Sequence, residues 1–407
     1  MKKFLALILS LSMVLGLTAC GGSKAPAGSD ASTPAATGST AAPTKAASDY
    51  QVAMITDYGD ITDQSFNQTT YEACKAFCEE NNMKFNYFKP AGDSDAERVA
   101  MIESAIDEGY NVIVMPGYAF AGAIKETADI YPEVTFIALD VSAGDLGDDY
   151  TLPSNLYCAV YQEELSGYMA GYAAVKLGYK HLGFLGGMAV PAVQRYGYGF
   201  VQGVDAAAAE LELTDVKLNY AYGNQFFGDA DITAAMDTWY AGGTEVVFAC
   251  GGGIYTSAVD AAKKVEGAKV IGVDVDQAGV IANYAAGEGA DAATVEGYKA
   301  LTVTSAMKGL YPATYDTLTD VIVNGNWEKY SAKIDTLGLV SADDPAANYV
   351  QIPMESTQWA DGAFTQDDYK ALVKAMFDGT LTVSNDTTKA ASDFATVITV
   401  EDLGNIK

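Results

Sequence analysis

The feature that most constrains this chain is an alternation between short apolar runs and segments with helical periodicity. The first run, with β-branched Val52 and Ile55, has the composition of a buried strand. In the first half the expected strands are residues 52–56, 84–88, 112–115, 135–139 and 156–160. The helical patterns between them are residues 67–81, 95–108 and 120–131. Strands that alternate with helices in this way predict parallel βαβ units.

A second series of the same kind follows. Its expected strands are residues 181–185, 216–220, 245–250 and 269–273, and its expected helices are residues 163–177, 192–210, 232–241 and 255–265. Two similar open sheets predict an α/β protein with two doubly wound lobes around a ligand cleft. No long run of identical residues links the halves, so the architecture repeats but the sequence does not.

Polar residues gather where the expected strands end, which is where open α/β sheets bind their ligands. The loop after the first strand offers a carboxylate (Asp57), an aromatic ring (Phe66) and an amide (Asn67). Asp63 or Ser65 would cap the following helix, because a short side-chain oxygen can accept hydrogen bonds from its first amides. Other strands end at Pro116-Gly-Tyr, Asp140, Gly186-Gly-Met, Gly251-Gly252-Gly253 and Asp274.

The chain continues beyond the second series, which suggests that it crosses between lobes more than once. We expect the first lobe to comprise residues 49–158 and 278–327, and the second to comprise residues 159–277 and 328–407. Helices are expected at 294–310, at 315–324 and at 366–378, the last capped by Thr365 and ended by Gly379. A strand is expected at 349–353.

The beginning of the chain has the pattern of an export signal. Two lysines precede the apolar run 4–17, which is too short to span a bilayer comfortably, and small residues follow it. Residues 1–19 are therefore a predicted signal peptide. Leu17-Thr-Ala-Cys20 resembles the lipobox of bacterial lipoproteins, in which Cys20 would become the lipid-bearing first residue; the alternative is a plain secreted protein. Residues 20–48, rich in Ala, Ser, Thr, Pro and Gly, are expected to form a flexible linker.

The charge balance narrows the range of partners. The formal net charge is −29, and removing residues 1–19 with their two lysines makes it 22 − 53 = −31. This charge disfavours nucleic acid and anionic membrane surfaces, because phosphate binding depends on Lys and Arg. Cys74 and Cys78, one helical turn apart, fit a buried helix face, with redox chemistry as the alternative. No zinc-type Cys/His spacing occurs, so no metal or cofactor is expected.

Motifs for enzymatic chemistry are weak. There is no GxxxxGK[ST] loop, and Gly251-Gly252-Gly253 lacks the spacing of a dinucleotide fingerprint. The single histidine, His181, begins an expected strand, and no GxSxG occurs. Aspartates at strand ends could form a hydrolytic pair, but they equally suit accepting hydrogen bonds from sugar hydroxyls or ring N–H groups. Both uses of the aspartates stay open at this point, and the three glycines fit a tight turn or a helix that starts close to a ligand, with Gly252 beside it.

Several motifs together resemble the basic membrane protein family of nucleoside-binding lipoproteins, which supply ABC importers. They are Asp57…Asp63-Gln-Ser-Phe-Asn67, Gly186-Gly-Met…Pro191…Arg195…Gly199-Phe…Gly203, Gly272-Val-Asp274-Val-Asp276-Gln277 and Thr304-Ser-Ala-Met-Lys308. The resemblance covers about residues 50–310, more loosely the tail. It implies a type I periplasmic-binding-protein-like fold whose two lobes close on a purine nucleoside.

The resemblance also implies roles for individual residues. Phe66 would be one of two aromatics that sandwich the base, and Phe227 the other, with Phe226 as the alternative. Asp57, Asn67 and Asp140 would make polar contacts to the base or near the hinge. Asp274 and Lys308 would bind the ribose, although Lys308 could instead be a solvated residue on an amphipathic helix.

The resulting hypothesis is a lipid-anchored protein on the extracytoplasmic face of the cell membrane that delivers a nucleoside to an ABC permease. Two alternatives remain at this stage. The first is a binding protein of the same fold for a sugar, a nucleobase or a signalling molecule, which would lack an aromatic sandwich. The second is a cell-surface enzyme or adhesin, which would need a titratable pair or an exposed apolar patch.

Overall fold

The computed structural model describes residues 47–147 and 149–407, and residues Lys45–Lys407 form one compact unit. The predicted signal peptide, the lipidation site Cys20 and nearly all of the predicted linker lie outside the described residues. Within those described, no helix is long and apolar enough to span a membrane.

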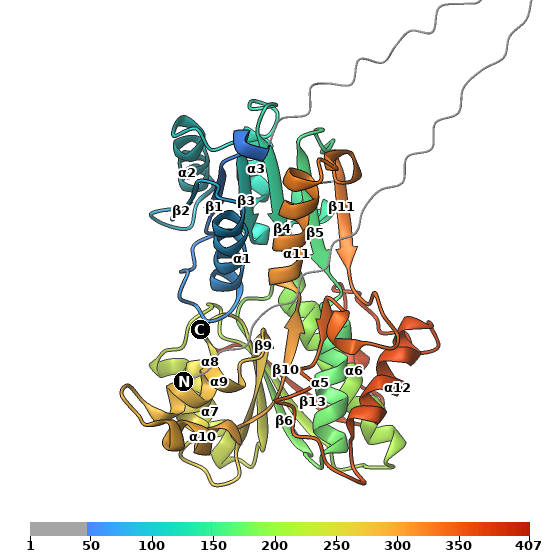
Figure 1. Cartoon of the computed structure of the whole chain (residues 1–407). Helices are drawn as coiled ribbons and strands as arrows, with labels where there is room; N and C mark the ends of the chain where they lie inside the picture. The colour runs from blue at the N-terminus through green and yellow to red at the C-terminus, as the bar shows by residue number, and fades with distance from the viewer. Residues whose placement is uncertain (1–46, 148) are drawn as a thin grey trace, which may run out of the picture. The chain divides into compact units, whose positions relative to one another are not determined.

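Two sheets organise this unit into two lobes (Figure 1). The first lobe has strand order β11-β5-β4-β3-β1-β2, with every pairing parallel. Its strands are β1 (Val52–Ile55), β2 (Phe85–Phe88), β3 (Val112–Pro116), β4 (Thr135–Leu139), β5 (Leu156–Tyr161) and β11 (Lys333–Leu337).

The second sheet has the order β12-β10-β9-β8-β6-β7-β13 and is parallel except where β12 meets β10. Its strands are β6 (His181–Gly186), β7 (Lys217–Tyr222), β8 (Val246–Cys250), β9 (Lys269–Asp274), β10 (Thr302–Lys308), β12 (Val350–Gln351) and β13 (Thr399–Asn405). The orders β4-β3-β1-β2 and β9-β8-β6-β7 are equivalent, which confirms the predicted repeat of architecture.

Helices cover both faces of each sheet because alternate strand residues point to opposite sides. In the first lobe, Val52 and Met54 pack with α1 (Phe66–Glu80), whereas Ala53 and Ile55 pack with α2 (Asp95–Asp107) and α3 (Ala121–Thr127). Two short elements, η2 (Tyr118–Phe120) and α4 (Ala143–Leu146), complete the strand-end loops. From the other end of the chain, α11 (Leu310–Leu318) packs on α1 and continues as the π-helical turn η3 (Thr319–Val323).

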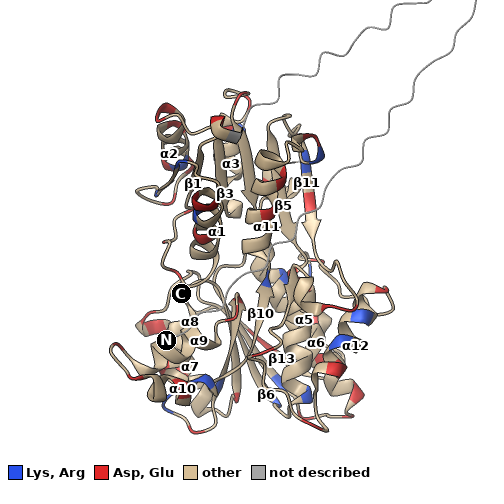
Figure 2. Cartoon of the chain, viewed as in Figure 1, with Lys and Arg blue, Asp and Glu red and all other residues tan. Residues whose placement is uncertain are grey.

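The second sheet is covered in the same way. One face packs against α5 (Glu163–Lys176) and α6 (Pro191–Glu210), and the other against α7 (Ala230–Ala241) and α8 (Tyr255–Ala262). The helix α9 (Ala278–Ala286) shares the buried cluster of α7 and α8, and α10 (Ala292–Lys299) packs on α9. The helix α12 (Gln366–Phe377) shares the buried cluster of α5 and α6. As predicted, Thr365 caps α12, its side chain accepting a hydrogen bond from the Asp368 amide. Basic residues are scattered among more numerous acidic residues in both lobes (Figure 2).

The chain passes between the two sheets three times in the described residues: after β5, after β10 and after β11. The three crossings are tied together by the backbone. The Gln162 amide donates to Leu337 O (3.0 Å), the Tyr349 amide donates to Gly338 O (3.0 Å), and the Gly309 amide donates to Tyr349 O (2.6 Å). More than one crossing was predicted, and these bonds join the three connecting segments to one another.

The path after residue 277 differs from the prediction. The sequence placed 278–327 in the first lobe, but β10 joins the second sheet, with α9 and α10 packed beside it. Only the segment from α11 to β11 returns to the first lobe, so β11 (Lys333–Leu337), predicted in the second lobe, belongs to the first sheet instead. The predicted helix 294–310 is also wrong, because only 292–299 is helical and Thr302–Lys308 is a strand. Pairing with β9 overrides the local preference, and the strand's buried Thr304 and Ser305 hydroxyls are hydrogen-bonded.

Two edge strands, β11 and β13, had no signal in the sequence. Their side chains are mostly half-buried or exposed, so they lack the continuous apolar run of a buried parallel strand. They are recognised only by their pairing with β5 and β7.

Candidate functional site

A cavity of about 580 Å³ lies at the carboxyl ends of strands from both sheets. All eight residues predicted to bind a ligand line it, although they come from separate parts of the chain. They are Asp57, Phe66, Asn67, Asp140, Phe227, Gly252, Asp274 and Lys308. These residues lie together because most of them follow parallel strands, and the carboxyl ends of the parallel strands in each open sheet lie at one edge of that sheet.

Asp57 and Asn67 form one corner of the cavity. Asp57 Oδ1 accepts hydrogen bonds from the Tyr58 amide (2.6 Å), the Gly59 amide (2.6 Å) and Asn67 Nδ2 (3.1 Å). Within the described residues, no group donates to Asp57 Oδ2. Burial raises the pKa of Asp57 above its usual value, and these three hydrogen bonds oppose that rise. The corner therefore presents a carboxylate oxygen as an acceptor.

Asp63 holds the start of α1 in place. Its carboxylate accepts from the amides of Ser65 (2.9 Å), Asn67 (2.8 Å) and Gln68 (3.1 Å). Of the two predicted caps, Asp63 therefore does the capping, and the Ser65 side chain makes no capping bond. Burial raises the pKa of Asp63 to about 6, against the opposing effect of the backbone bonds.

Lys308, at the end of β10, is the centre of a buried ionic cluster. Its Nζ lies 2.5 Å from Asp140 Oδ2, 3.4 Å from Glu163 Oε1 and 3.9 Å from Asp274 Oδ1. Arg195 adds a second positive charge, with its Nε 2.6 Å from Glu163 Oε2. Lys308 is therefore a buried strand residue, which corrects the alternative of a solvated lysine on a helix.

The close charges shift the pKa values of Lys308 and Asp140. Burial alone would lower the pKa of Lys308, but the carboxylates of Asp140, Asp274 and Glu163 raise it above its usual value. Burial raises the pKa of Asp140, and Lys308 opposes that rise. Asp140 Oδ1 is buried and has no hydrogen-bond partner among the described residues. The site thus holds a fixed cation surrounded by acceptors with unused capacity.

Both strand-end aspartates have unusual backbones. Asp140 follows β4 with φ +61°, and Asp274 ends β9 with φ +64°, in the left-handed region that few non-glycine residues adopt. Such conformations persist only where the surroundings hold them, and they concentrate at binding and catalytic sites. Here they bring two carboxylates onto the same lysine.

Aromatic rings form much of the remaining wall. The Phe66 ring centroid lies 4.7 Å from Lys308 Nζ, within cation–π range. Phe226 and Phe227 both line the cavity, but Phe226 is the more enclosed, while Phe227 is 61% exposed. Phe226 lies against Gly187 and Gly251, where a Cβ atom would come within 2.4 and 2.8 Å of its ring. Of these two rings, Phe226 is therefore held more firmly against the cavity wall, whereas the predicted Phe227 lies mostly in solvent.

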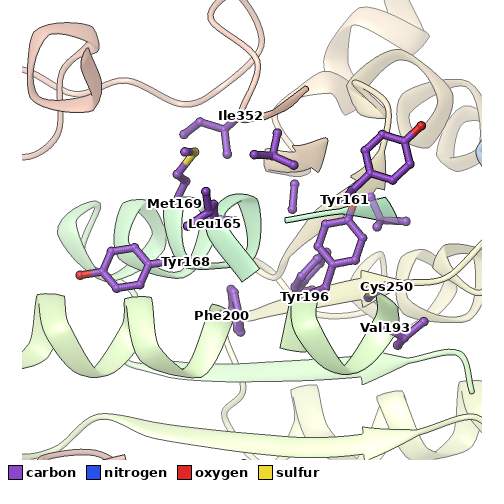
Figure 3. Close-up of a cluster of buried hydrophobic side chains, with 14 of the residues drawn as sticks. Tyr161, Leu165, Tyr168, Met169, Val193, Tyr196, Phe200, Cys250 and Ile352 are labelled. Atoms are coloured by element: carbon purple, nitrogen blue, oxygen red, sulfur yellow. The ribbon is translucent and has the colours of Figure 1, made fainter. Parts of the chain in front are cut away.

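Several lining or supporting residues escaped prediction. Tyr58, which lines the cavity, has its ring centroid 6.2 Å from that of Phe226, and its hydroxyl lies 3.4 Å from Tyr118 Oη. Glu163 begins α5, and Tyr196 on α6 belongs to the buried cluster of Figure 3. Their residue types gave no signal, because tyrosines and glutamates at helix starts are common in any sequence. Glu163 comes close to Lys308 only because the chain crosses to the second lobe after β5.

Metal or thiol chemistry has no visible support in the described part of the chain. No group of three or more His, Cys, Asp or Glu residues there is arranged to hold a metal ion. Cys74 and Cys78 are buried on one face of α1, as predicted, and both are free thiols. Burial raises the pKa of Cys78 to about 12 and also raises that of Cys74, which suppresses the reactive thiolate.

Solved structures share this architecture. A solute-binding protein of an ABC transporter system from Aeropyrum pernix K1 aligns with a TM-score of 0.61, at 19% identity, over 85% of this chain and 90% of its own. A corresponding protein from Conexibacter woesei aligns with a TM-score of 0.58, at 21% identity, over 83% of this chain and 99% of its own. At these identities the likeness establishes the fold, two α/β lobes of the periplasmic-binding type.

Curated relatives extend the comparison to sequence. The "ABC transporter nucleoside-binding protein BmpA" of Lactococcus lactis is 29% identical over 57% of this chain, and the match spans 66% of that protein, just under two thirds. The "CD4+ T-cell-stimulating antigen" of Listeria monocytogenes is 30% identical over 68% of this chain and 74% of its own length. "Basic membrane protein B" of Borreliella burgdorferi is 27% identical over 71% of this chain and 78% of its own length.

A family model covers most of the folded unit. The model named Bmp, described as "ABC transporter substrate-binding protein PnrA-like", matches residues 50–349, the span that contains every cavity residue described above. The chain therefore belongs to the Bmp family of ABC transporter substrate-binding proteins.

Proposed function

We propose that this protein binds a nucleoside with a purine base in the cavity and delivers it to the membrane subunits of an ABC importer. One observation carries the proposal: a single cavity combines a wall of aromatic rings with carboxylates grouped around a buried lysine. A nucleoside needs both environments, one for its flat base and one for its sugar hydroxyls. The name of the Lactococcus relative agrees with this ligand class.

The base would lie against Phe66 and Phe226. Stacking on an aromatic face contributes about 1–3 kcal/mol per base and discriminates poorly between bases. Selectivity would come from Asp57, because its Oδ2 can accept a hydrogen bond but, while ionised, cannot donate one. Guanine and hypoxanthine carry a ring N–H on their Watson–Crick edge, whereas adenine has an unprotonated nitrogen there. We therefore expect guanosine and inosine to bind more tightly than adenosine.

The ribose would lie near Asp140, Asp274 and Lys308. Hydrogen bonds to a charged partner contribute about 1.5–3 kcal/mol each, and a buried carboxylate left without its ligand partner is costly. A free base would leave these groups unmatched, so the nucleoside should bind more tightly than its base. No covalent chemistry is required, since a ligand that contacts both lobes shifts an equilibrium between open and closed states.

Isothermal titration calorimetry of guanosine, adenosine, guanine and ribose against the wild type and three variants tests this proposal. Phe66→Ala should weaken both nucleosides by similar factors, about 5- to 100-fold. Asp274→Ala should narrow the gap between guanosine and guanine, mainly by weakening guanosine. Asp57→Asn should narrow the gap between guanosine and adenosine, because an amide can donate as well as accept.

Two outcomes would contradict the proposal. Equal wild-type affinities for guanosine and guanine would exclude a ribose-binding role for Asp274. Binding of ribose without either nucleoside would make this a sugar-binding member of the same fold. Exposed Lys75→Met serves as the matched control and should leave every affinity unchanged.

We further propose that Cys20 carries a lipid anchor, which would hold the protein on the extracytoplasmic face of the membrane near its permease. The supporting observation is Leu17-Thr-Ala-Cys20 after a short apolar run. Cys20→Ala should release the protein into the medium or the soluble fraction, as followed by immunoblotting of fractionated cells. A variant that stays in the membrane fraction to the same extent would contradict the anchor.

A further inference from the structure

Two of the motifs named in the sequence analysis, Asp63-Gln-Ser-Phe-Asn67 and Gly272-Val-Asp274-Val-Asp276-Gln277, are hydrogen-bonded to each other between the lobes. Ser65 belongs to the first lobe, and its Oγ donates a hydrogen bond of 2.6 Å to Asp274 Oδ2, 209 residues away in the second lobe. Beside it, Gln277 Nε2 donates to the backbone oxygen of Gln64 (3.2 Å). Ser65 and Gln277 are fully buried, and neither belongs to the lining of the ligand cavity.

Local structure leaves the Ser65 side chain available for this contact. Ser65 occupies the N-cap position of α1, where a serine normally bonds the first helical amides. Asp63 accepts those bonds instead, from the amides of Ser65, Asn67 and Gln68. The serine hydroxyl is thus released from its usual local role and is directed at the other lobe.

In the second lobe, Asp274 and Gln277 are also held in place by local hydrogen bonds. Asp274 Oδ1 accepts a hydrogen bond from Tyr196 Oη (3.2 Å) and lies 3.9 Å from Lys308 Nζ, which leaves Oδ2 for Ser65. Gln277 Oε1 accepts from the Val273 amide (2.9 Å), so its Nε2 is fixed toward the first lobe. Each carboxylate oxygen has two acceptor sites, so the Ser65 bond leaves Asp274 able to bind a ligand.

We propose that Ser65 is a positioning residue that ties the lobes together before the ligand arrives, with Gln277 as its companion. This inference rests on the proposed function in one respect: closure of the two lobes is taken to capture the ligand. A bond present in the closed state and lost in the open state raises the closed population of the free protein. Because affinity scales with the binding-competent fraction, losing the bond weakens every ligand by the same factor.

The first measurement needs no ligand. Hydrogen–deuterium exchange of the full chain should show faster exchange of amides 65–68 and 273–278 in Ser65→Ala than in the wild type, about tenfold or more. Thr70→Val is the matched control, because Thr70 is fully buried on the same helix and, among the described residues, its hydroxyl donates only to Phe66 O within α1. That variant should exchange like the wild type at both segments.

The second measurement separates this role from direct ligand contact. Ser65→Ala should weaken guanosine, adenosine and guanine by one common factor, about 10- to 100-fold, and should have no further effect in an Asp274→Ala background. The inference would be overturned if the amides of Ser65→Ala exchanged at wild-type rates, or if Ser65→Ala lost affinity for one ligand and not for the others. If no nucleoside binds but exchange at both segments still rises, the proposed function fails and the tie between the lobes stands.

Discussion

At the scale of single residues, Lys308 shows how one buried charge keeps a site assembled. Three carboxylates surround it, and three aromatic rings lie within 6 Å of its Nζ: Phe66 at 4.7 Å, Tyr161 at 5.3 Å and Tyr196 at 5.8 Å. Burying a lysine among apolar rings is costly unless its charge is paired. The carboxylates pair its charge, and Lys308 in turn opposes the rise in the pKa of Asp140 that burial causes.

Replacing Lys308 by Met should therefore leave several negative charges buried without a counter-ion. Removing one partner of a buried ion pair typically costs about 3–5 kcal/mol, and we expect that loss in the free energy of unfolding at pH 7.5. The loss should shrink toward pH 5, as Asp140 takes up a proton. Urea titrations at both pH values measure it, with exposed Lys75→Met as the control; a loss below about 1 kcal/mol at pH 7.5 would contradict this account.

At the scale of elements, the pair α5 and α6 is packed backbone against backbone. A Cβ atom at Gly199 would come within 2.0 Å of Glu164 O, and one at Gly167 within 2.2 Å of Tyr196 O. Gly171 and Gly203 repeat the pattern one turn further along. Tyr196 and Glu163 lie on these two helices, so their close approach positions the ionic cluster.

Gly199→Ala should accordingly force the two helices apart. Overpacking costs about 1–3 kcal/mol or more when only backbone can move away, and the affinity for guanosine should fall with it. Gly279→Ala in α9 is the matched control, because it is also helical but has open space around it. It should stabilise the protein by about 0.4–1 kcal/mol, and equal effects of the two substitutions in urea titration would refute the packing argument.

At the scale of the whole molecule, buried carboxyl groups make stability depend on pH. Burial raises the pKa of Glu164 to about 7, helped by the nearby charge of Glu163, whereas an unfolded glutamate titrates near 4.3. Between these values the native state binds more protons than the unfolded state. The free energy of unfolding therefore falls as pH rises through this window, and Asp63 acts in the same direction.

Glu164→Gln should remove part of this dependence. The amide carries no charge at any pH, so the variant should be more stable than the wild type at pH 8, by about 1–3 kcal/mol, and nearly equal to it near pH 4. Glu126→Gln, the same substitution at an exposed glutamate, is the matched control. Thermal unfolding followed by circular dichroism across this range measures the difference, and parallel profiles for Glu164→Gln and the wild type would exclude the assignment.

Much of the fold and the candidate site followed from local sequence. The alternation of apolar runs and helical patterns predicted two βα series, because burial on both faces of a parallel sheet demands continuous apolar strands. The polar residues just after those runs then had to gather at the carboxyl edge of each sheet. Asp57, Asp140 and Asp274 could be placed at one cavity for this reason, before any long-range contact was known.

What local sequence could not determine are the contacts between distant segments. Lys308 and Asp140 are 168 residues apart, and Ser65 and Asp274 are 209 apart. The strand that carries Lys308 was predicted to be helical, because the partners of its buried hydroxyls, Thr357 for Thr304 and the Gln277 amide for Ser305, lie in distant segments. Periodicity reports which face of an element is buried, not which element covers it. Only the tertiary structure decided the path of the chain after residue 277, the greater enclosure of Phe226 than of Phe227, and the hydrogen bonds that join the lobes at Ser65 and Gln277.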